Sequence, residues 1–128
     1  MLIVTPLYAA ALAILFLGLS VRVIVARRSG RVGFGASPNT DLERRVRVHA
    51  NFVEYTPFAL LLLGMAELRN APVLWLHAGG GLLAVGRLAH AFGVSRRSTD
   101  DLGRLIGMAG SQGAILLGAI LIVVTAKV

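Results

Sequence analysis

Apolar residues dominate three long uncharged stretches of this chain of 128 residues. The stretches are Leu2–Val21, Asn70–Gly86 and Leu105–Ala126. Each one is close to the roughly 20 residues that a helix needs to cross a lipid bilayer. The pattern of polar and apolar positions therefore predicts three transmembrane helices.

A fourth apolar segment, Tyr55–Ala66, is too short to cross a membrane by itself. It becomes long enough when it is extended back through a polar stretch to about Asp41. Helix N-cap residues with acidic residues in the first turn, over Asn39–Glu43, favour a helix start at this point. We therefore expect an all-α fold, an integral membrane four-helix bundle that forms a single domain over residues 1–128. The predicted helices cover residues 2–27, 40–68, 71–94 and 99–126.

Positive charge gathers around the first and third predicted connections, and the net charge of the chain is +7. Basic loops stay on the cytoplasmic side of a membrane, so we expect these two connections inside and both termini outside the cytoplasm. Anionic membrane lipids are the expected partners of these arginines. Nucleic-acid binding is not expected, because no soluble basic domain is present. The two clusters comprise Arg27, Arg28, Arg31, Arg44, Arg45 and Arg47, and then Arg96, Arg97 and Arg104.

A polar stripe runs along the predicted second helix. Arg44, Arg47, Asn51 and Glu54 are spaced by three, four and three residues, which places them on one helix face. Such a face is costly inside a membrane unless it meets protein or a water-filled site. An arginine fork suits a carboxylate and Glu54 suits an ammonium, while the neighbouring Tyr55 adds a phenol. The stripe thus fits a small zwitterionic peptide, unless Arg47 and Glu54 are satisfied within the bundle by each other or by neighbouring helices.

The third and fourth helices add further polar groups. Arg87 would be buried and needs a partner, for which Glu54 is one candidate. His90 is either a hydrogen-bonded core histidine or a catalytic base. Arg104, at the start of the fourth helix, would favour a bound thiolate over a thiol, since a nearby positive charge lowers a thiol pKa.

The remaining polar residues and the absence of cysteine narrow the chemistry. The three histidines, His49, His77 and His90, lack the paired spacing of a metal site, so no metal is predicted. His49 lies beside the polar stripe, and His77 lies toward the other side of the membrane. Arg22 either reaches the lipid head groups or points toward the same site. Because the chain contains no cysteine, sulfur chemistry must use the sulfur of a ligand.

Two motifs resemble those of a known family. Glu43–Pro57 reads E-R-R-V-R-V-H-A-N-F-V-E-Y-T-P and resembles the E-R-x-x-R-x-x-x-N-x-x-E-Y-x-P stretch of the MAPEG family, membrane-associated proteins in eicosanoid and glutathione metabolism. Gly86–His90 resembles the G-R-x-x-H stretch of the same family. Val94 and Met108 stand where several members have tyrosines, so the chain looks more like the short bacterial members than the prostaglandin- or leukotriene-forming ones.

The resemblance implies a homotrimer in a bacterial inner membrane, with glutathione bound between neighbouring subunits near the cytosolic leaflet. It also implies a glutathione-dependent transferase or peroxidase that acts on lipophilic electrophiles. Arg104 would then stabilise the thiolate, with Arg97 as the alternative. By position, the implied glutathione contacts are Arg47, Asn51, Glu54 and Tyr55, and the supporting residues are Arg44, Arg87 and His90.

A non-enzymatic membrane protein is the alternative function, either a transporter or a binding or scaffold subunit that retains a relic site. Small four-helix efflux transporters usually carry an acidic residue in the first helix, and this chain has none there. Proton-coupled transport would therefore depend on Glu54. Glycine-rich faces on the third and fourth helices permit close packing, either inside one bundle or between subunits.

Overall fold

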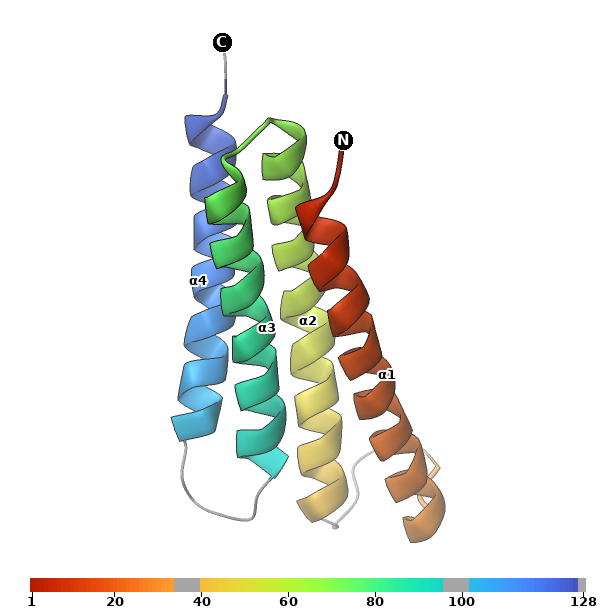
Figure 1. Ribbon diagram of the computed structural model, residues 1–128. Coiled ribbons are helices and arrows are strands. Elements are labelled where there is room, and N and C mark those ends of the chain that lie inside the picture. The colour runs from red at the N-terminus through yellow and green to blue at the C-terminus, as the bar shows by residue number, and fades with distance from the viewer. Residues whose placement is uncertain (34–39, 96–101, 127–128) are drawn as a thin grey trace.

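The computed structural model describes residues 1–33, 40–95 and 102–126, which form an all-α structure with four helices. Successive helices run in opposite directions, and the N- and C-termini lie at the same end of the structure (Figure 1). The fold therefore confirms the predicted all-α class and the four helices. Their bounds are α1 Val4–Gly30, α2 Thr40–Leu68, α3 Val73–Ser95 and α4 Leu102–Val124.

The helix ends agree with the sequence to within a few residues. Helix α1 extends beyond the predicted residue 27 and stops at Arg31, which adopts a left-handed conformation with φ 51°. The backbone N–H of Arg31 donates to the Arg28 carbonyl, and this bond closes the last turn. Asn70, with φ 60°, reverses the chain between α2 and α3. The predicted first residues of the fourth helix lie outside the described ranges.

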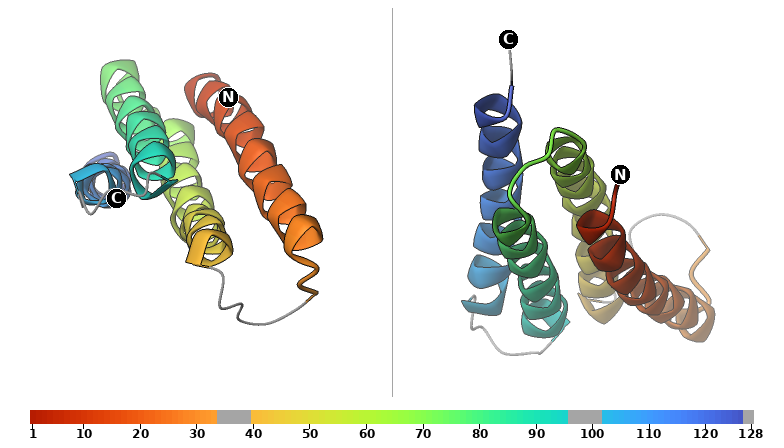
Figure 2. Two further views of the ribbon diagram at one scale, coloured as in Figure 1. Left: turned by 90° about the horizontal axis from the view of Figure 1, so that it is seen from below. Right: turned by 45° about the horizontal axis from the view of Figure 1, so that its top comes forward.

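Helix α2 lies at the centre of the arrangement and packs against each of the other three helices. Helices α3 and α4 form the most intimate pair, whereas α1 packs on α2 and α3. Figures 1 and 2 show α1 leaning away from the other helices toward the end opposite the termini. The central helix therefore presents different faces to α1 and to the α3–α4 pair.

Glycines allow α3 and α4 to touch along their backbones. A Cβ added at Gly103 would lie 2.6 Å from the Gly93 Cα, and one added at Gly107 would lie 2.4 Å from the His90 Cβ. Both distances are shorter than carbon–carbon contacts allow, so these positions require glycine. Gly18 of α1 has no neighbour within 4 Å of such a Cβ. The glycine faces of α3 and α4 thus serve packing inside the bundle at these positions.

Glu67, near the end of α2, fixes the start of α1. Its side-chain oxygens accept hydrogen bonds from the backbone N–H groups of Val4, at 2.6 Å, and Thr5, at 2.8 Å, as well as from Ile3. A carboxylate is favourable at a helix N-terminus because the first N–H groups lack partners within the helix. This contact attaches α1 to α2 at the end that holds the termini.

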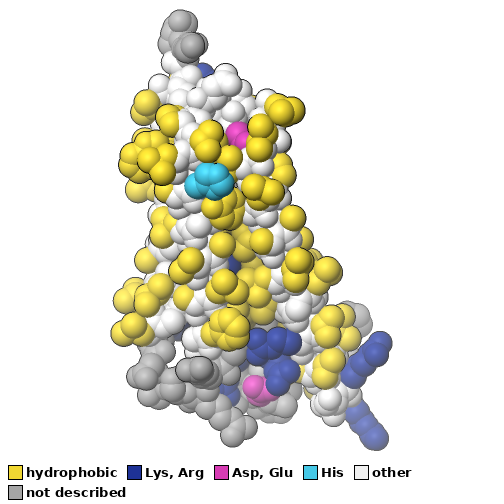
Figure 3. All heavy atoms as spheres, viewed as in Figure 1, with side chains coloured by type: hydrophobic (Ala, Val, Ile, Leu, Met, Phe, Trp, Pro, Cys, Tyr) yellow, Lys and Arg dark blue, Asp and Glu magenta, His cyan; other side chains and the backbone are white. Residues whose placement is uncertain are grey.

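The outer surface is apolar along most of its length. Figure 3 shows hydrophobic side chains over the middle and upper parts of the structure, while arginines gather near the lower end of this face. Among the described residues, α1 and α4 are each long and apolar enough to cross a membrane. An apolar belt with a basic end is typical of a surface that faces lipid and one set of head groups.

Candidate functional site

A cleft of about 530 Å³ lies between α2, α3 and α4, formed by the N-terminal half of α2, the C-terminal half of α3 and the start of α4. These segments meet at the end of the bundle opposite the termini. The cleft brings together residues that are more than 50 positions apart in the chain. It is lined by Glu43, Arg44, Arg47, Ala50, Asn51, Glu54, His90, Arg104 and Met108.

Most of the site residues expected from the sequence line this cleft, and two do not. Tyr55 is half-buried and lies outside the lining. Arg87 is fully buried behind the cleft wall, with 1% of its surface exposed. Arg97, the alternative to Arg104, lies outside the described residues. The six that line the cleft are Arg44, Arg47, Asn51, Glu54, His90 and Arg104.

Arg87 holds three helices together beneath the cleft. Its Nη1 donates to the Asn51 Oδ1 at 2.7 Å, and its Nη2 donates to the Gly107 carbonyl at 2.7 Å. These acceptors lie on α2 and α4, so one guanidinium from α3 ties both neighbours. Its partner is therefore Asn51 rather than Glu54, the candidate that the sequence offered. Arg87 acts as a positioning residue for the cleft.

Asn51 is held from both sides. While its Oδ1 accepts from Arg87, its Nδ2 donates to the Met108 sulfur at 3.3 Å. Both polar ends of the amide are thus used, and the side chain is fixed in one orientation at the cleft wall. Met108, which provides this contact, stands where several members of the family that the motifs resemble have a tyrosine.

Arg47 and Glu54 project from α2 into the open part of the cleft. Both side chains are exposed, and neither makes a hydrogen bond or ion pair with the described part of the chain. Within the described ranges, Arg47 and Glu54 are therefore bonded neither to each other nor to neighbouring helices. A guanidinium and a carboxylate on a membrane-length helix require water, a ligand or another protein surface.

The other charged groups complete a mixed electrostatic lining. Arg44 and Arg104 approach from α2 and α4, and buried His90 forms part of the α3 wall. The lining contains three arginines and two glutamates, which gives 3 − 2 = +1 with His90 neutral. A small positive excess with both signs present suits a zwitterion that carries a net negative charge.

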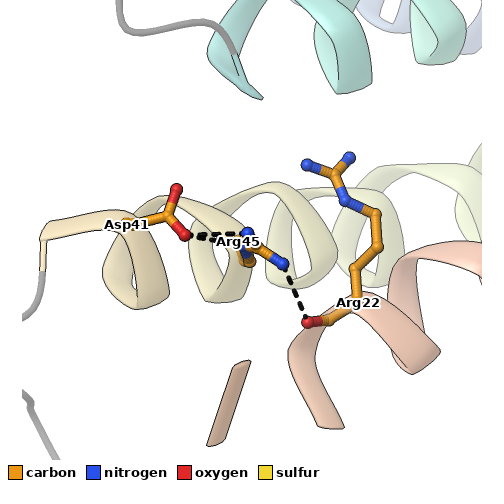
Figure 4. Close-up of polar contacts among 3 residues, drawn as sticks. All are labelled: Arg22, Asp41 and Arg45. Carbon is orange, nitrogen blue, oxygen red and sulfur yellow. Dashed lines mark hydrogen bonds and ion pairs between the residues drawn. The ribbon is translucent and has the colours of Figure 1, made fainter. Parts of the chain in front are cut away.

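A second polar column on α2 faces α1 and was not recognised from the sequence. Arg45 pairs with Asp41 at 2.8 Å, and its Nη1 donates to the Arg22 carbonyl of α1 at 3.5 Å (Figure 4). One turn further along, the His49 Nε2 lies 3.0 Å from the Ser20 Oγ. His49 therefore belongs to the α1–α2 interface rather than to the cleft. The spacing of four residues from 41 to 45 to 49 was the available signal.

His77, the remaining histidine, lies away from the cleft. His77 is near the end that holds the termini, where its Nδ1 lies 3.1 Å from the Tyr8 hydroxyl. In the described ranges no group of three or more histidines, aspartates and glutamates is arranged to hold a metal ion. The polar groups that line the cleft are guanidinium, carboxylate, amide and imidazole side chains.

Comparison with known proteins agrees with the resemblance of the two sequence motifs. The MAPEG family model matches residues 5–124. The chain is 34% identical over 114 residues to Inner membrane protein YecN of Escherichia coli strain K12, with 89% of this chain and 86% of that protein covered. The protein of the same name from Escherichia coli O6:H1 gives the same values. No solved structure matches.

Proposed function

Because the chain belongs to the MAPEG family of membrane proteins, we propose that it is a glutathione-dependent transferase or peroxidase that acts on lipophilic electrophiles. The observation that carries the proposal is a pair of exposed charges, Arg47 and Glu54, which line the cleft on a membrane-length helix and have no partner among the residues that the structure describes. Charged side chains on a membrane-spanning helix cost free energy unless they meet water, protein or a ligand. A role in ligand binding explains why this helix carries them.

The cleft matches glutathione in size and in charge. Its volume of about 530 Å³ falls within the roughly 300–1,000 Å³ of small-molecule sites. Glutathione carries two carboxylates and one ammonium at neutral pH, so its net charge opposes the +1 excess of the lining. Arg47 would pair with a carboxylate through its planar fork, and Glu54 would accept from the ammonium. Asn51, fixed by Arg87, would contact the peptide part.

Arg104 would hold the sulfur as a thiolate, because a guanidinium favours the charged form. In a transfer reaction, the sulfur forms a bond to the electrophilic carbon and the leaving group departs with its bonding electrons. In a peroxidase reaction, two glutathione molecules supply two electrons and form a disulfide, while the peroxide becomes an alcohol and water. Positioning and charge stabilisation, rather than a protein nucleophile, would provide the rate acceleration.

The proposal includes a homotrimer in the inner membrane. The cleft face of α2 continues through exposed apolar residues, Phe58, Leu61 and Met65, toward the other end of the helix. A neighbouring subunit covering this face would shield Arg47 and Glu54 from lipid and leave the cleft at a subunit boundary. Helices α2 and α3 would span the membrane beside α1 and α4. The basic end would face the cytoplasm and contact anionic lipids, with both termini outside.

The test is the ultraviolet absorbance of the thiolate when glutathione is added to the detergent-purified protein. Wild type should give a saturable signal at neutral pH. Arg104→Ala should reduce it at least tenfold, and Arg104→Lys should retain part of it. Arg69→Ala is the matched control, since Arg69 is an exposed arginine at the opposite end of the structure. An unchanged signal in Arg104→Ala would contradict the role of Arg104.

The same preparation separates catalysis from the non-enzymatic alternative. If glutathione gives no saturable signal in wild type, the enzyme proposal is wrong. Proton-dependent drug resistance that disappears with Glu54→Gln would then identify a transporter, because Glu54 is the exposed carboxylate of the α2 stripe. Absence of both activities would leave a binding or scaffold subunit.

A further inference from the structure

Met108 brings a thioether into the cleft, and we propose that lipophilic hydroperoxides oxidise it to the sulfoxide and thereby weaken glutathione binding. The side chain is half-buried and lines the cleft between α2, α3 and α4. Because the chain has no cysteine, its methionines are the sulfur groups open to oxidation. The inference rests on the proposed function, since it concerns the regulation of the same site.

The sulfur of Met108 is held in place by a hydrogen bond from α2. The Asn51 Nδ2 donates to this sulfur at 3.3 Å, and Asn51 is itself held by Arg87. Since Asn51 also lines the cleft, the bond places the sulfur beside the cleft wall. A thioether sulfur has two lone pairs, and the bond from Asn51 uses one of them. The other lone pair remains to attack a peroxide.

Arg104 supplies positive charge one helical turn from Met108. The two residues are four positions apart on α4 and both line the cleft, so they share one face of the helix. When a sulfur atom attacks a peroxide, negative charge develops on the departing alkoxide oxygen. A guanidinium beside that oxygen stabilises this charge. Arg104 should therefore make Met108 more reactive than its accessible surface alone would predict.

The oxidation needs only the hydroperoxide as co-reactant. The sulfur attacks the terminal oxygen of the hydroperoxide, so an S–O bond forms while the O–O bond breaks. The sulfur gives up two electrons, and the proton of the terminal hydroxyl passes to the departing alkoxide. The products are methionine sulfoxide and an alcohol. A lipophilic hydroperoxide would reach the cleft along the exposed apolar face of α2 that includes Phe58 and Leu61.

The added oxygen changes the hydrogen bonding of the cleft. A sulfoxide is polar, and its oxygen accepts hydrogen bonds more strongly than a thioether sulfur does. Asn51 already donates to this side chain, and Arg104 lies one turn away on the same face. The sulfoxide oxygen would accept from these two groups, which the proposed function assigns to glutathione. Oxidation would thus lower the affinity for glutathione, and methionine sulfoxide reductases would restore it.

A second methionine of the same chain provides the internal comparison. Met65 is 45% exposed on the apolar face of α2, whereas Met108 is half-buried, so accessibility alone predicts faster oxidation of Met65. Trypsin leaves the two on separate peptides, residues 48–69 and 105–127, which mass spectrometry quantifies. In lipid nanodiscs treated with cumene hydroperoxide, we expect Met108 to be oxidised roughly fivefold faster than Met65. In the unfolded chain the two rates should be equal.

Matched variants separate the cause of the oxidation from its consequence. Arg104→Ala should bring the two oxidation rates close to each other, whereas Arg28→Ala, at an exposed arginine of α1 outside the cleft lining, should not. Calorimetry before and after hydroperoxide treatment should show roughly a fivefold loss of glutathione affinity in wild type and in Met65→Leu. Met108→Leu, which removes the sulfur at similar volume, should show no loss on treatment. Circular dichroism establishes that each variant is folded.

Two results would overturn the proposal. Equal oxidation rates at Met65 and Met108 in the folded protein would show that the cleft does not direct the reaction. Unchanged glutathione affinity after complete oxidation of Met108 would show that the sulfoxide does not regulate the site. Failure of the proposed function gives a different result, because untreated wild type would then bind no glutathione. The peptide oxidation rates are measured without glutathione and test the reaction at Met108 in either case.

Discussion

Replacing Gly107 with alanine tests the backbone contact between α3 and α4 that forms one side of the cleft. The added Cβ would lie 2.4 Å from the His90 Cβ, 2.8 Å from the His90 Cα and 2.9 Å from the Gly86 carbonyl oxygen. Non-bonded carbon atoms prefer about 3.5–4.0 Å. Since two of these obstacles belong to the backbone of α3, a side-chain rotation cannot relieve the overlap. The helices would have to separate by about 1 Å.

The size of the effect follows from two losses and one gain. Overpacking of a tight interface costs about 1–3 kcal/mol. Separation of the helices also weakens the bond from Arg87 to the Gly107 carbonyl, at 2.7 Å, and a bond from a charged donor is worth about 1.5–3 kcal/mol. Alanine returns up to about 1 kcal/mol through its helix propensity. The free energy of unfolding should therefore fall by about 2–5 kcal/mol.

The assay is reversible unfolding in mixed micelles, followed by circular dichroism. Gly18→Ala is the matched control, because nothing lies within 4 Å of its added Cβ, and its stability should be unchanged or higher. Glutathione binding to folded Gly107→Ala should also weaken, since His90 and the start of α4 would move. Equal stability of the two alanine variants would refute the close packing of α3 on α4.

Two further substitutions test the positioning contacts. Arg87→Lys should lower the free energy of unfolding by about 2 kcal/mol, because one ammonium cannot reach both Asn51 and the Gly107 carbonyl, which accept from different nitrogens of the guanidinium. Stability equal to wild type in a denaturant titration would contradict that geometry. Glu67→Gln leaves a single acceptor oxygen for the N–H groups at the start of α1, so amide exchange at Thr5 should accelerate several-fold, and unchanged protection would refute the cap.

The four helices were accessible from the sequence because apolar length and cap residues are local properties. The uncharged stretch Leu105–Ala126 predicted α4 without knowledge of its neighbours, and the end of α2 was placed at residue 68. The end of α1 was less accessible, since its last turn closes through the left-handed Arg31 rather than through glycine. The trimer and the membrane topology stay predictions, because no described contact tests them.

The sequence could predict which residues share one face of a helix, but it could not predict what packs against that face. The spacing of Arg47, Asn51 and Glu54 predicted one polar face, and all three line the cleft. Tyr55 follows Glu54 by about 100° of helical rotation and lies outside the lining, although it belongs to the same motif. A sequence motif shows which residues occur together. The angle between two residues around the helix axis decides whether they lie on the same face.

Residue spacing could not predict the hydrogen-bond partners of buried polar groups either. Arg87 bonds to Asn51 and to a backbone carbonyl of α4, and backbone acceptors have no signature in a sequence. His49 was placed near the polar stripe, but the structure pairs it with Ser20 of α1. Two residues on one helix can face different neighbours when their positions differ by only a few residues. The packing of α1 against α2 determines this choice.

Binding calorimetry with glutathione, on wild type and on Arg47→Ala, tests the central claim most directly. Arg47 has no partner in the described part of the chain, so its removal should leave stability unchanged while the affinity falls at least tenfold, through loss of a charge-assisted carboxylate contact. Wild type should bind in a saturable manner. Absence of saturable heat in wild type, or equal affinity in Arg47→Ala, would contradict the assignment of this cleft as a glutathione site.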